Sequence, residues 1–334
     1  MSEHIRLTAA EIGAIWACYM TESATIPMLK YFYSIAEDSE VKSVIELALE
    51  TSKEHLNELG TLFEKEEYPT PVGFSEEDVN LNAPRLFSDT YALYFIRNFG
   101  KAGLAAHGAA VSSAAREDIR ALYKRYLQDA VEIEDEAKKA LLSKGLFIRP
   151  PHLPTPKEAE FVKNETFLRG WLGERRPLTA EEITHMYMNY MNNLYGKSLL
   201  LGFAQTAQIA KVKKHFVRGV ELSKDILDVL KILLEESNLP APMTWDAEVS
   251  ASSVSVFSDK LMMFQANALS AISLANIGGS IALSFRRDIA AKYSKQMINV
   301  GFYAEDGAEI MINNGWLELP PIAANRNDLV NQKK

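Results

Sequence analysis

The chain has 334 residues, of which 47% are hydrophobic and 24% are charged. These proportions are typical of a globular protein and exclude a disordered or fibrous chain. The net charge of −8 argues against a nucleic-acid-binding protein, because such a protein needs basic side chains to neutralise phosphates. The single cysteine, Cys18, cannot form an internal disulfide, and the polar N-terminal sequence has no signal-peptide core. We therefore expect a cytoplasmic protein.

The chain contains one sequence unit twice. Residues 7–12 (LTAAEI) recur as residues 178–183 (LTAEEI), a shift of 171 positions. Residues 87–89 (FSD) recur as residues 257–259 at a shift of 170. A nearly constant shift over scattered matches indicates an internal duplication.

The duplication predicts two domains. The proline-rich stretch 150–156 separates the two copies. We place the first domain at residues 1–155 and the second at residues 156–334.

Each copy is predicted to form four helices. The first helix of each copy begins with a capping box, Thr8 with Glu11 and Thr179 with Glu182. Apolar positions of the first helix then follow at spacings of three and four residues. This predicted inner face comprises Ile12, Ile15, Tyr19, Glu22, Ile26, Leu29 and Tyr33.

A long connection separates the second and third helices of the first copy. It runs from about Pro69 to Pro84 and is too long for a tight hairpin, which favours a crossover like that of ferritin-like bundles. The alternating patterns that predict strands are absent. The predicted fold is therefore all-α, with two tandem ferritin-like four-helix bundles.

One segment resembles a membrane span. The 25 residues between Lys260 and Arg286 carry no charge. Its counterpart in the first copy contains Asp89, Arg97 and Lys101, which a spanning helix would hardly tolerate. We therefore predict no membrane span, and instead a helix buried between the two bundles.

The bundle fold prompts a search for a carboxylate-bridged dimetal site. Such a site needs two Glu-x-x-His motifs, and the full set is missing: the first copy has none and the second has one, residues 182–185 (EITH). The spacing places Glu22 and His55 on inner faces of the first bundle, where an unpaired charge is costly. One interpretation makes these two residues ligands of iron, manganese or zinc, completed by Glu58 or His107. The other makes Glu22 and His55 a structural ion pair, and two ligands alone are too few for a stable metal site.

The second copy has lost these ionisable groups. The shift places Asn193 at the position of Glu22 and Ile226 at the position of His55. We therefore expect a structural second copy with no turnover of a substrate. It has no net charge, with 17 basic and 17 acidic residues from residue 171 onward, which suits self-association or a partner surface.

Three segments carry a family resemblance: residues 74–89 (FSEEDVNLNAPRLFSD), residues 141–151 (LLSKGLFIRPP) and residues 52–55 (SKEH). They resemble the bacterial family called domain of unknown function 3231, found mainly in Bacillus-type spore formers. The resemblance covers nearly the whole chain as two copies. It implies a ferritin-like bundle distantly similar to spore-coat proteins of the coat F type, and it supplies no catalytic residues.

The predicted function is a structural or binding role, related to sporulation or stress, without an established enzymatic activity. The predicted partners are a second copy of the chain or a coat-type protein. One alternative is a metal-binding protein that uses Glu22 and His55. Another is a carrier of a small apolar ligand in a cavity lined by aromatic residues such as Tyr19 and Tyr91.

Overall fold

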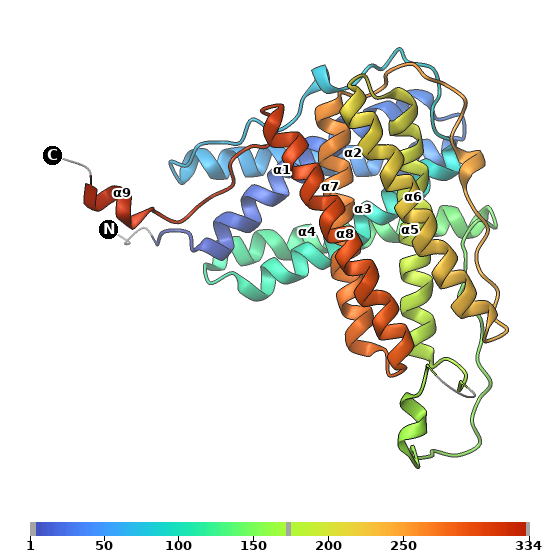
Figure 1. Ribbon diagram of the computed structural model, residues 1–334. Coiled ribbons are helices and arrows are strands. Elements are labelled where there is room, and N and C mark those ends of the chain that lie inside the picture. The colour runs from blue at the N-terminus through green and yellow to red at the C-terminus, as the bar shows by residue number, and fades with distance from the viewer. Residues whose placement is uncertain (1–4, 172–174, 332–334) are drawn as a thin grey trace.

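A computed structural model describes residues 5–171 and 175–331, and its secondary structure is helical apart from two isolated β-bridges. Figure 1 shows two bundles of long helices that cross, the first running across the view and the second down it. The first bundle comprises α1 (Ala9–Ile35), α2 (Ser39–Lys65), α3 (Asp89–Ser113) and α4 (Glu117–Ser143). The second comprises α5 (Ala180–Thr206), α6 (Ala210–Glu235), α7 (Asp259–Leu283) and α8 (Arg287–Asn313). A short helix, α9 (Arg326–Asn331), lies on the C-terminal tail. The predicted fold of two tandem four-helix bundles is confirmed.

The predicted capping boxes begin α1 and α5. The side chain of Thr8 accepts the backbone N–H of Glu11, and the Glu11 carboxylate accepts the N–H of Thr8. Glu11 is buried, and its other oxygen accepts the N–H groups of Ala115 and Arg116 at 2.9 and 2.7 Å. One carboxylate thus stabilises the start of α1 and the turn between α3 and α4.

The two long connections pair with each other. Residues 66–88 and 236–258 each cross over from one helical hairpin to the next. Val79 forms an antiparallel bridge with Phe257, and Phe87 forms one with Val249. The repeat shift of 170 relates Val79 to Val249 and Phe87 to Phe257, so each bridge is the counterpart of the other. The two copies therefore meet around an approximate two-fold axis.

An aromatic core fills the junction between the bundles. The ring of Tyr91 stacks on Phe87 in its own copy and on Tyr195 in the other copy, with ring centroids 4.5 and 5.6 Å apart. Tyr31 contacts Phe257 edge to face at 5.3 Å. Such offset and edge-to-face pairs add stability beyond the burial of their area. The two bundles therefore share one core at their junction.

The helix α7 is the one described helix long and apolar enough to cross a membrane by length and composition. Its first turns, which include Leu261 and Met262, are buried. However, only 28% of its most apolar 18-residue stretch is buried, and Ile272 and Leu283 are exposed. The prediction that this helix is buried between the bundles is therefore right only for its N-terminal part. The rest extends past the first bundle, which has no helix there to cover it (Figure 1).

The segment between α4 and α5 runs along the outside of the molecule. Residues 152–166 are exposed and contain only the start of a short 3-10 turn, Glu165–Leu168. The predicted boundary at residues 155 and 156 lies in this segment and stays a prediction.

Candidate metal centre in the first bundle

The inner face of α1 keeps part of the predicted face, including Ile15 and Glu22, but Cys18 faces the interior in place of Tyr19. Residues at spacings of four and three line the interior, and they include Ile15, Cys18 and Glu22. Tyr19, predicted to face the core, is only half-buried and lies toward α2. Because Cys18 and Glu22 are four residues apart, their side chains stack on the same face of the helix.

His55 of α2 connects two carboxylates. Its Nδ1 lies 3.0 Å from Oε1 of Glu22, and its Nε2 lies 3.0 Å from Oδ2 of Asp129 on α4. Burial alone would lower the pKa of His55, but the hydrogen bonds and charges of the two carboxylates outweigh it and raise that pKa. The charged imidazolium is therefore the form that this arrangement favours.

Tyr126 of α4 holds the His55 ring in place. The two rings stack with centroids 3.6 Å apart and an angle of 24° between their planes. The Tyr126 hydroxyl donates to the His55 backbone carbonyl at 3.3 Å. The orientation of His55 is thus fixed by stacking as well as by its two hydrogen bonds.

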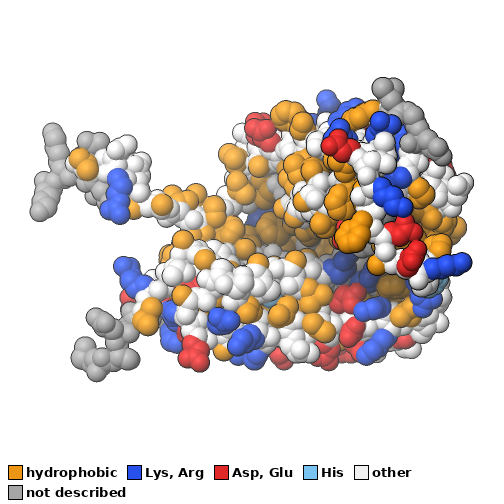
Figure 2. Space-filling view, turned by 90° about the horizontal axis from the view of Figure 1, so that it is seen from below, with side chains coloured by type: hydrophobic (Ala, Val, Ile, Leu, Met, Phe, Trp, Pro, Cys, Tyr) orange, Lys and Arg blue, Asp and Glu red, His pale blue; other side chains and the backbone are white. Residues whose placement is uncertain are grey.

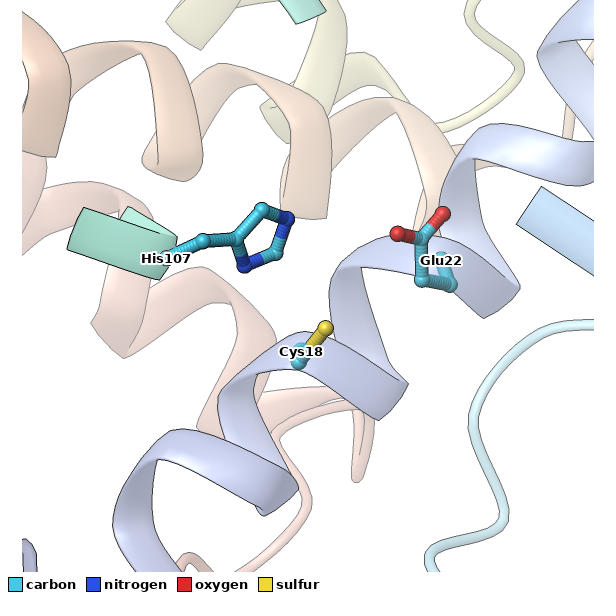
Figure 3. Close-up of side chains that lie close together, drawn as sticks. All are labelled: Cys18, Glu22 and His107. Atoms are coloured by element: carbon cyan, nitrogen blue, oxygen red, sulfur yellow. The ribbon is translucent and has the colours of Figure 1, made fainter. Parts of the chain in front are cut away.

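A second set of donors meets on the other side of Glu22. A ligand atom of Cys18, one of Glu22 and one of His107 on α3 all lie within 4.8 Å of one another, and all three residues are buried. Figure 3 shows the Glu22 carboxylate, the Cys18 thiol and the His107 ring gathered around one small volume. The three residues thus combine sulfur, oxygen and nitrogen donors in one place.

The protonation of this cluster follows from its burial. Burial and then the Glu22 charge raise the pKa of the Cys18 thiol well above its ordinary value. Burial and then the charge of His55 lower the pKa of His107 to about 4, so His107 is neutral at pH 7. A neutral imidazole is the form that binds metals.

Two buried oxygen atoms at this cluster have no hydrogen-bond partner. They are Oε2 of Glu22 and the hydroxyl oxygen of Tyr123 on α4. The ring of Tyr123 lies near that of His107, with centroids 5.8 Å apart, and burial, then the charges of Cys18 and Glu22, raise the pKa of Tyr123. A buried polar atom without a partner is costly, and such an atom often marks a site that a water molecule or an ion completes.

The structure brings together part of the predicted set. Glu22 and His55 are hydrogen-bonded as expected, and His107 lies beside them. Glu58, the other candidate, points outward and pairs with Arg125 at 2.7 Å. That Glu22 and His55 ligate a metal stays a prediction.

Sequence reasoning missed Cys18 and Asp129. The spacing of four residues between Cys18 and Glu22 is the sequence signal that the two share a face of the helix. Asp129 lies on the fourth helix and reaches His55 only in the folded bundle, so no local pattern marks it.

The second bundle has no equivalent cluster at the corresponding positions. The repeat shift places Asn189 at the position of Cys18 and Ile277 at that of His107. Asn189 donates to the Ser280 hydroxyl at 2.7 Å, and Asn193 donates to the backbone carbonyl of Asn189 at 2.8 Å. These asparagines therefore form hydrogen bonds within a packed interior.

The two tyrosines proposed to line a ligand cavity do not meet. Tyr91 is fully buried in the junction between the bundles. Tyr19 lines an open groove of about 430 Å³ between α1 and α2, together with polar residues such as Lys53 and Asn57. The structure therefore gives no common cavity for Tyr19 and Tyr91.

Comparison with known proteins identifies a family for the chain. A family profile described as "Protein of unknown function (DUF3231)" matches residues 1–159 and again residues 166–329. The chain belongs to this family. The predicted resemblance and the internal duplication are both confirmed.

Two further comparisons add little about activity. A solved structure from Bacillus halodurans, provisionally described as a spore coat protein, is 19% identical with a TM-score of 0.41. The match covers 45% of this chain and 98% of that chain. No curated protein matches the sequence.

Proposed function

We propose that this protein binds one divalent metal ion inside its first bundle. The ligands are Cys18, Glu22 and His107, and His55 holds the Glu22 carboxylate in position. The observation that carries the proposal is the unpartnered Oε2 of Glu22, buried to 3% exposure beside a thiol and a neutral imidazole.

The distances suit a metal ion after small side-chain rotations. Three atoms within 4.8 Å of one another all lie within about 2.8 Å of a common point, whereas bonds to zinc are about 2.0–2.3 Å long. The difference is about 0.5–0.8 Å for each ligand. Glu22 has three rotatable side-chain bonds and can close this gap without movement of the helix.

The charges also balance. A divalent cation is neutralised by the Glu22 carboxylate and by a Cys18 thiolate, whose proton leaves to solvent as the metal binds. The high pKa of the free thiol does not prevent this, because a coordinated thiol is deprotonated outright. His55 and Asp129 form a separate neutral pair beside the site. A neutral cluster is the arrangement that burial tolerates best.

His55 acts on the site through Glu22 in this proposal. Both of its ring nitrogens are already bonded to carboxylates, which leaves neither free for a metal. Such a hydrogen bond to a ligand is the usual way in which a neighbouring group orients a metal site. Direct ligation by His55 would require one of these two bonds to break.

Elemental analysis of protein purified without a metal-affinity tag tests the proposal. We expect close to one transition-metal ion per chain in the wild type and a loss of most of it in Cys18→Ser, Glu22→Gln and His107→Gln. His215→Gln is the matched control, because it removes a buried imidazole from the second bundle, outside the cluster. Metal-free wild-type protein that also fails to bind added metal would contradict the proposal.

His55→Gln separates the two roles of His55. As a positioning residue, its loss lowers affinity about 10–100-fold and leaves one metal per chain at saturation. A complete loss of binding in correctly folded His55→Gln protein would instead support the prediction that His55 is itself a ligand.

A second candidate function is a structural role through self-association of the second bundle. Three large apolar side chains of α8, Ile298, Phe302 and Ile312, are 59–63% exposed. Figure 2, a view from below, shows further hydrophobic side chains among charged ones on that face. Apolar side chains that gather on a surface favour association, and the zero net charge of the second copy opposes it little.

Sedimentation velocity tests self-association. We expect the wild type to sediment as a dimer at micromolar concentration and Phe302→Glu as a monomer. Ser43→Glu on the exposed side of α2 adds the same charge elsewhere and should leave the dimer intact. A monomeric wild type would contradict this second function. A cytoplasmic location and a role in sporulation or stress fit both candidates and stay predictions.

A further inference from the structure

We infer that the site in the first bundle selects a thiophilic divalent metal of the zinc class, and that Cys18 is the residue that makes the selection. This inference rests on the proposed function and adds the identity of the metal. It follows from the three donors, from their number and from their burial.

The donor set distinguishes between classes of metal. Thiolate and imidazole ligands suit zinc and its neighbours, whereas magnesium, calcium and manganese prefer sites built from carboxylates, carbonyls and water. Of the three clustered residues, only Glu22 offers oxygen atoms. A calcium ion needs six to eight oxygen ligands and magnesium needs six, and one carboxylate with the Tyr123 hydroxyl cannot provide them.

The small number of donors favours low coordination. Zinc is bound tetrahedrally, by four ligands in structural sites or by three protein ligands and a water molecule in catalytic sites. Cys18, Glu22 and His107 supply three. Tyr123 on α4 has a buried hydroxyl without a partner, and its ring centroid lies 5.8 Å from that of His107. The fourth position is then a water molecule that Tyr123 can hydrogen-bond, or the Tyr123 oxygen itself.

The surroundings of the site argue for a bound ion without an organic substrate. Cys18, Glu22 and His107 are each no more than 9% exposed. None of the three lines the open groove beside α2, and none lines a small cavity in the second bundle, whose walls include Asn192 and Ser270. A metal held here connects α1 to α3 inside the bundle, so its binding free energy adds to the stability of the fold.

Cobalt(II) is the probe that tests the role of Cys18. It replaces zinc in sites of this kind, and a thiolate bound to it gives a charge-transfer band in the near ultraviolet. We expect metal-free wild-type protein titrated with cobalt(II) to show this band together with the strong visible bands of four-coordinate cobalt. Cys18→Ser should lose the ultraviolet band, and His215→Gln should keep it.

Competition then tests the selectivity. One equivalent of zinc should displace cobalt from the wild type, whereas a hundredfold excess of magnesium, calcium or manganese should not. Cys18→Ser should bind zinc more than about 100-fold more weakly than the wild type, because removal of a ligand costs more than removal of its hydrogen-bond partner.

The outcomes separate the inference from the proposed function. Cobalt that binds to wild type without a thiolate band, or that manganese displaces as readily as zinc, would overturn the selection by Cys18 and leave metal binding intact. No binding of cobalt or zinc to folded wild type would overturn both. Because the band is measured on the wild type, the test does not depend on whether the variants fold.

Discussion

Ser258 and Asp78 lie 180 positions apart in the chain, yet the Ser258 hydroxyl donates to Oδ1 of Asp78 at 2.6 Å. The Ser258 backbone N–H also donates to the Asp78 carbonyl, at 2.9 Å. The repeat-related pair, Ser88 and Glu248, makes the same two contacts from the opposite direction. Each serine also caps a helix, α7 or α3, so the start of that helix is tied to the other bundle.

The first prediction concerns this junction. Ser258→Ala removes the cap of α7 and one bond to Asp78, and we expect it to lower the free energy of unfolding by about 1–3 kcal/mol. Urea denaturation followed by circular dichroism measures the change. Ser294→Ala, an exposed serine bonded only within its own helix, should change the stability by less than about 0.5 kcal/mol. Equal effects of the two substitutions would show that the junction bond adds nothing.

The second prediction concerns the buried Glu22–His55 pair. His55→Leu leaves the Glu22 carboxylate buried without its partner, and we expect a cost of about 3–5 kcal/mol in the presence of a chelator. The double substitution Glu22→Leu/His55→Leu should cost less than the sum of the two single substitutions, because no unpaired charge remains. A double-mutant cycle of urea denaturation curves gives the coupling, and additive effects would argue against an energetically important pair.

The third prediction concerns pH. Burial, then the charge of Arg218, lower the pKa of His215 in the second bundle to about 4. In the unfolded chain the pKa of His215 is about 6.5. Between pH 4 and pH 6.5 the unfolded chain therefore binds a proton at His215 more readily than the folded protein does. The contribution of His215 to the free energy of unfolding is complete above pH 6.5. It is lost as the pH falls toward 4, and the loss amounts to up to about 3 kcal/mol.

Unfolding midpoints at pH 7 and pH 5 test this dependence. We expect His215→Gln to lose less stability on acidification than the wild type does. The exposed residue His152 provides the control, since His152→Gln should keep the wild-type dependence. If the unfolding midpoint of His215→Gln changes between pH 7 and pH 5 as much as that of the wild type, His215 is not the source of the pH dependence.

The fourth prediction concerns Gly73, which has a φ of +63° in the connection between α2 and α3. A Cβ atom there would lie 2.6 Å from Oγ of Ser23, so Gly73→Ala meets both backbone strain and a clash with α1. Gly315 has a φ of +68° but no neighbour within 4 Å of its Cβ position. We expect Gly315→Ala to cost about 1–2 kcal/mol and Gly73→Ala measurably more, by thermal denaturation. Equal costs would mean that Ser23 moves aside freely.

The fifth prediction concerns metal-dependent stability. A ligand present at 100 times its dissociation constant stabilises the folded state by about 2.7 kcal/mol. We expect added zinc to raise the melting temperature of the wild type and a chelator to reverse the rise. Glu22→Gln should show no such rise, whereas the control His215→Gln should show it in full. A similar rise in Glu22→Gln would place the bound zinc elsewhere.

The sequence by itself determined most of the fold. The recurrence of LTAAEI as LTAEEI identified the duplication, and the capping boxes at Thr8 and Thr179 marked where α1 and α5 begin. These are local signals, since a cap or a helical period depends on residues within one or two turns. They also placed Glu22 and His55 in the interior of the first bundle.

Only the tertiary structure decided which side chains meet. On α1, Cys18 faces the core and Tyr19 lies at a groove. Packing against other helices sets the rotation of this weakly amphipathic helix. Asp129, His107 and Tyr123 reach the site from α3 and α4, and no local pattern encodes a contact between distant helices. The pairing of the two long connections was equally hidden, since it depends on the approximate two-fold axis that relates the folded copies.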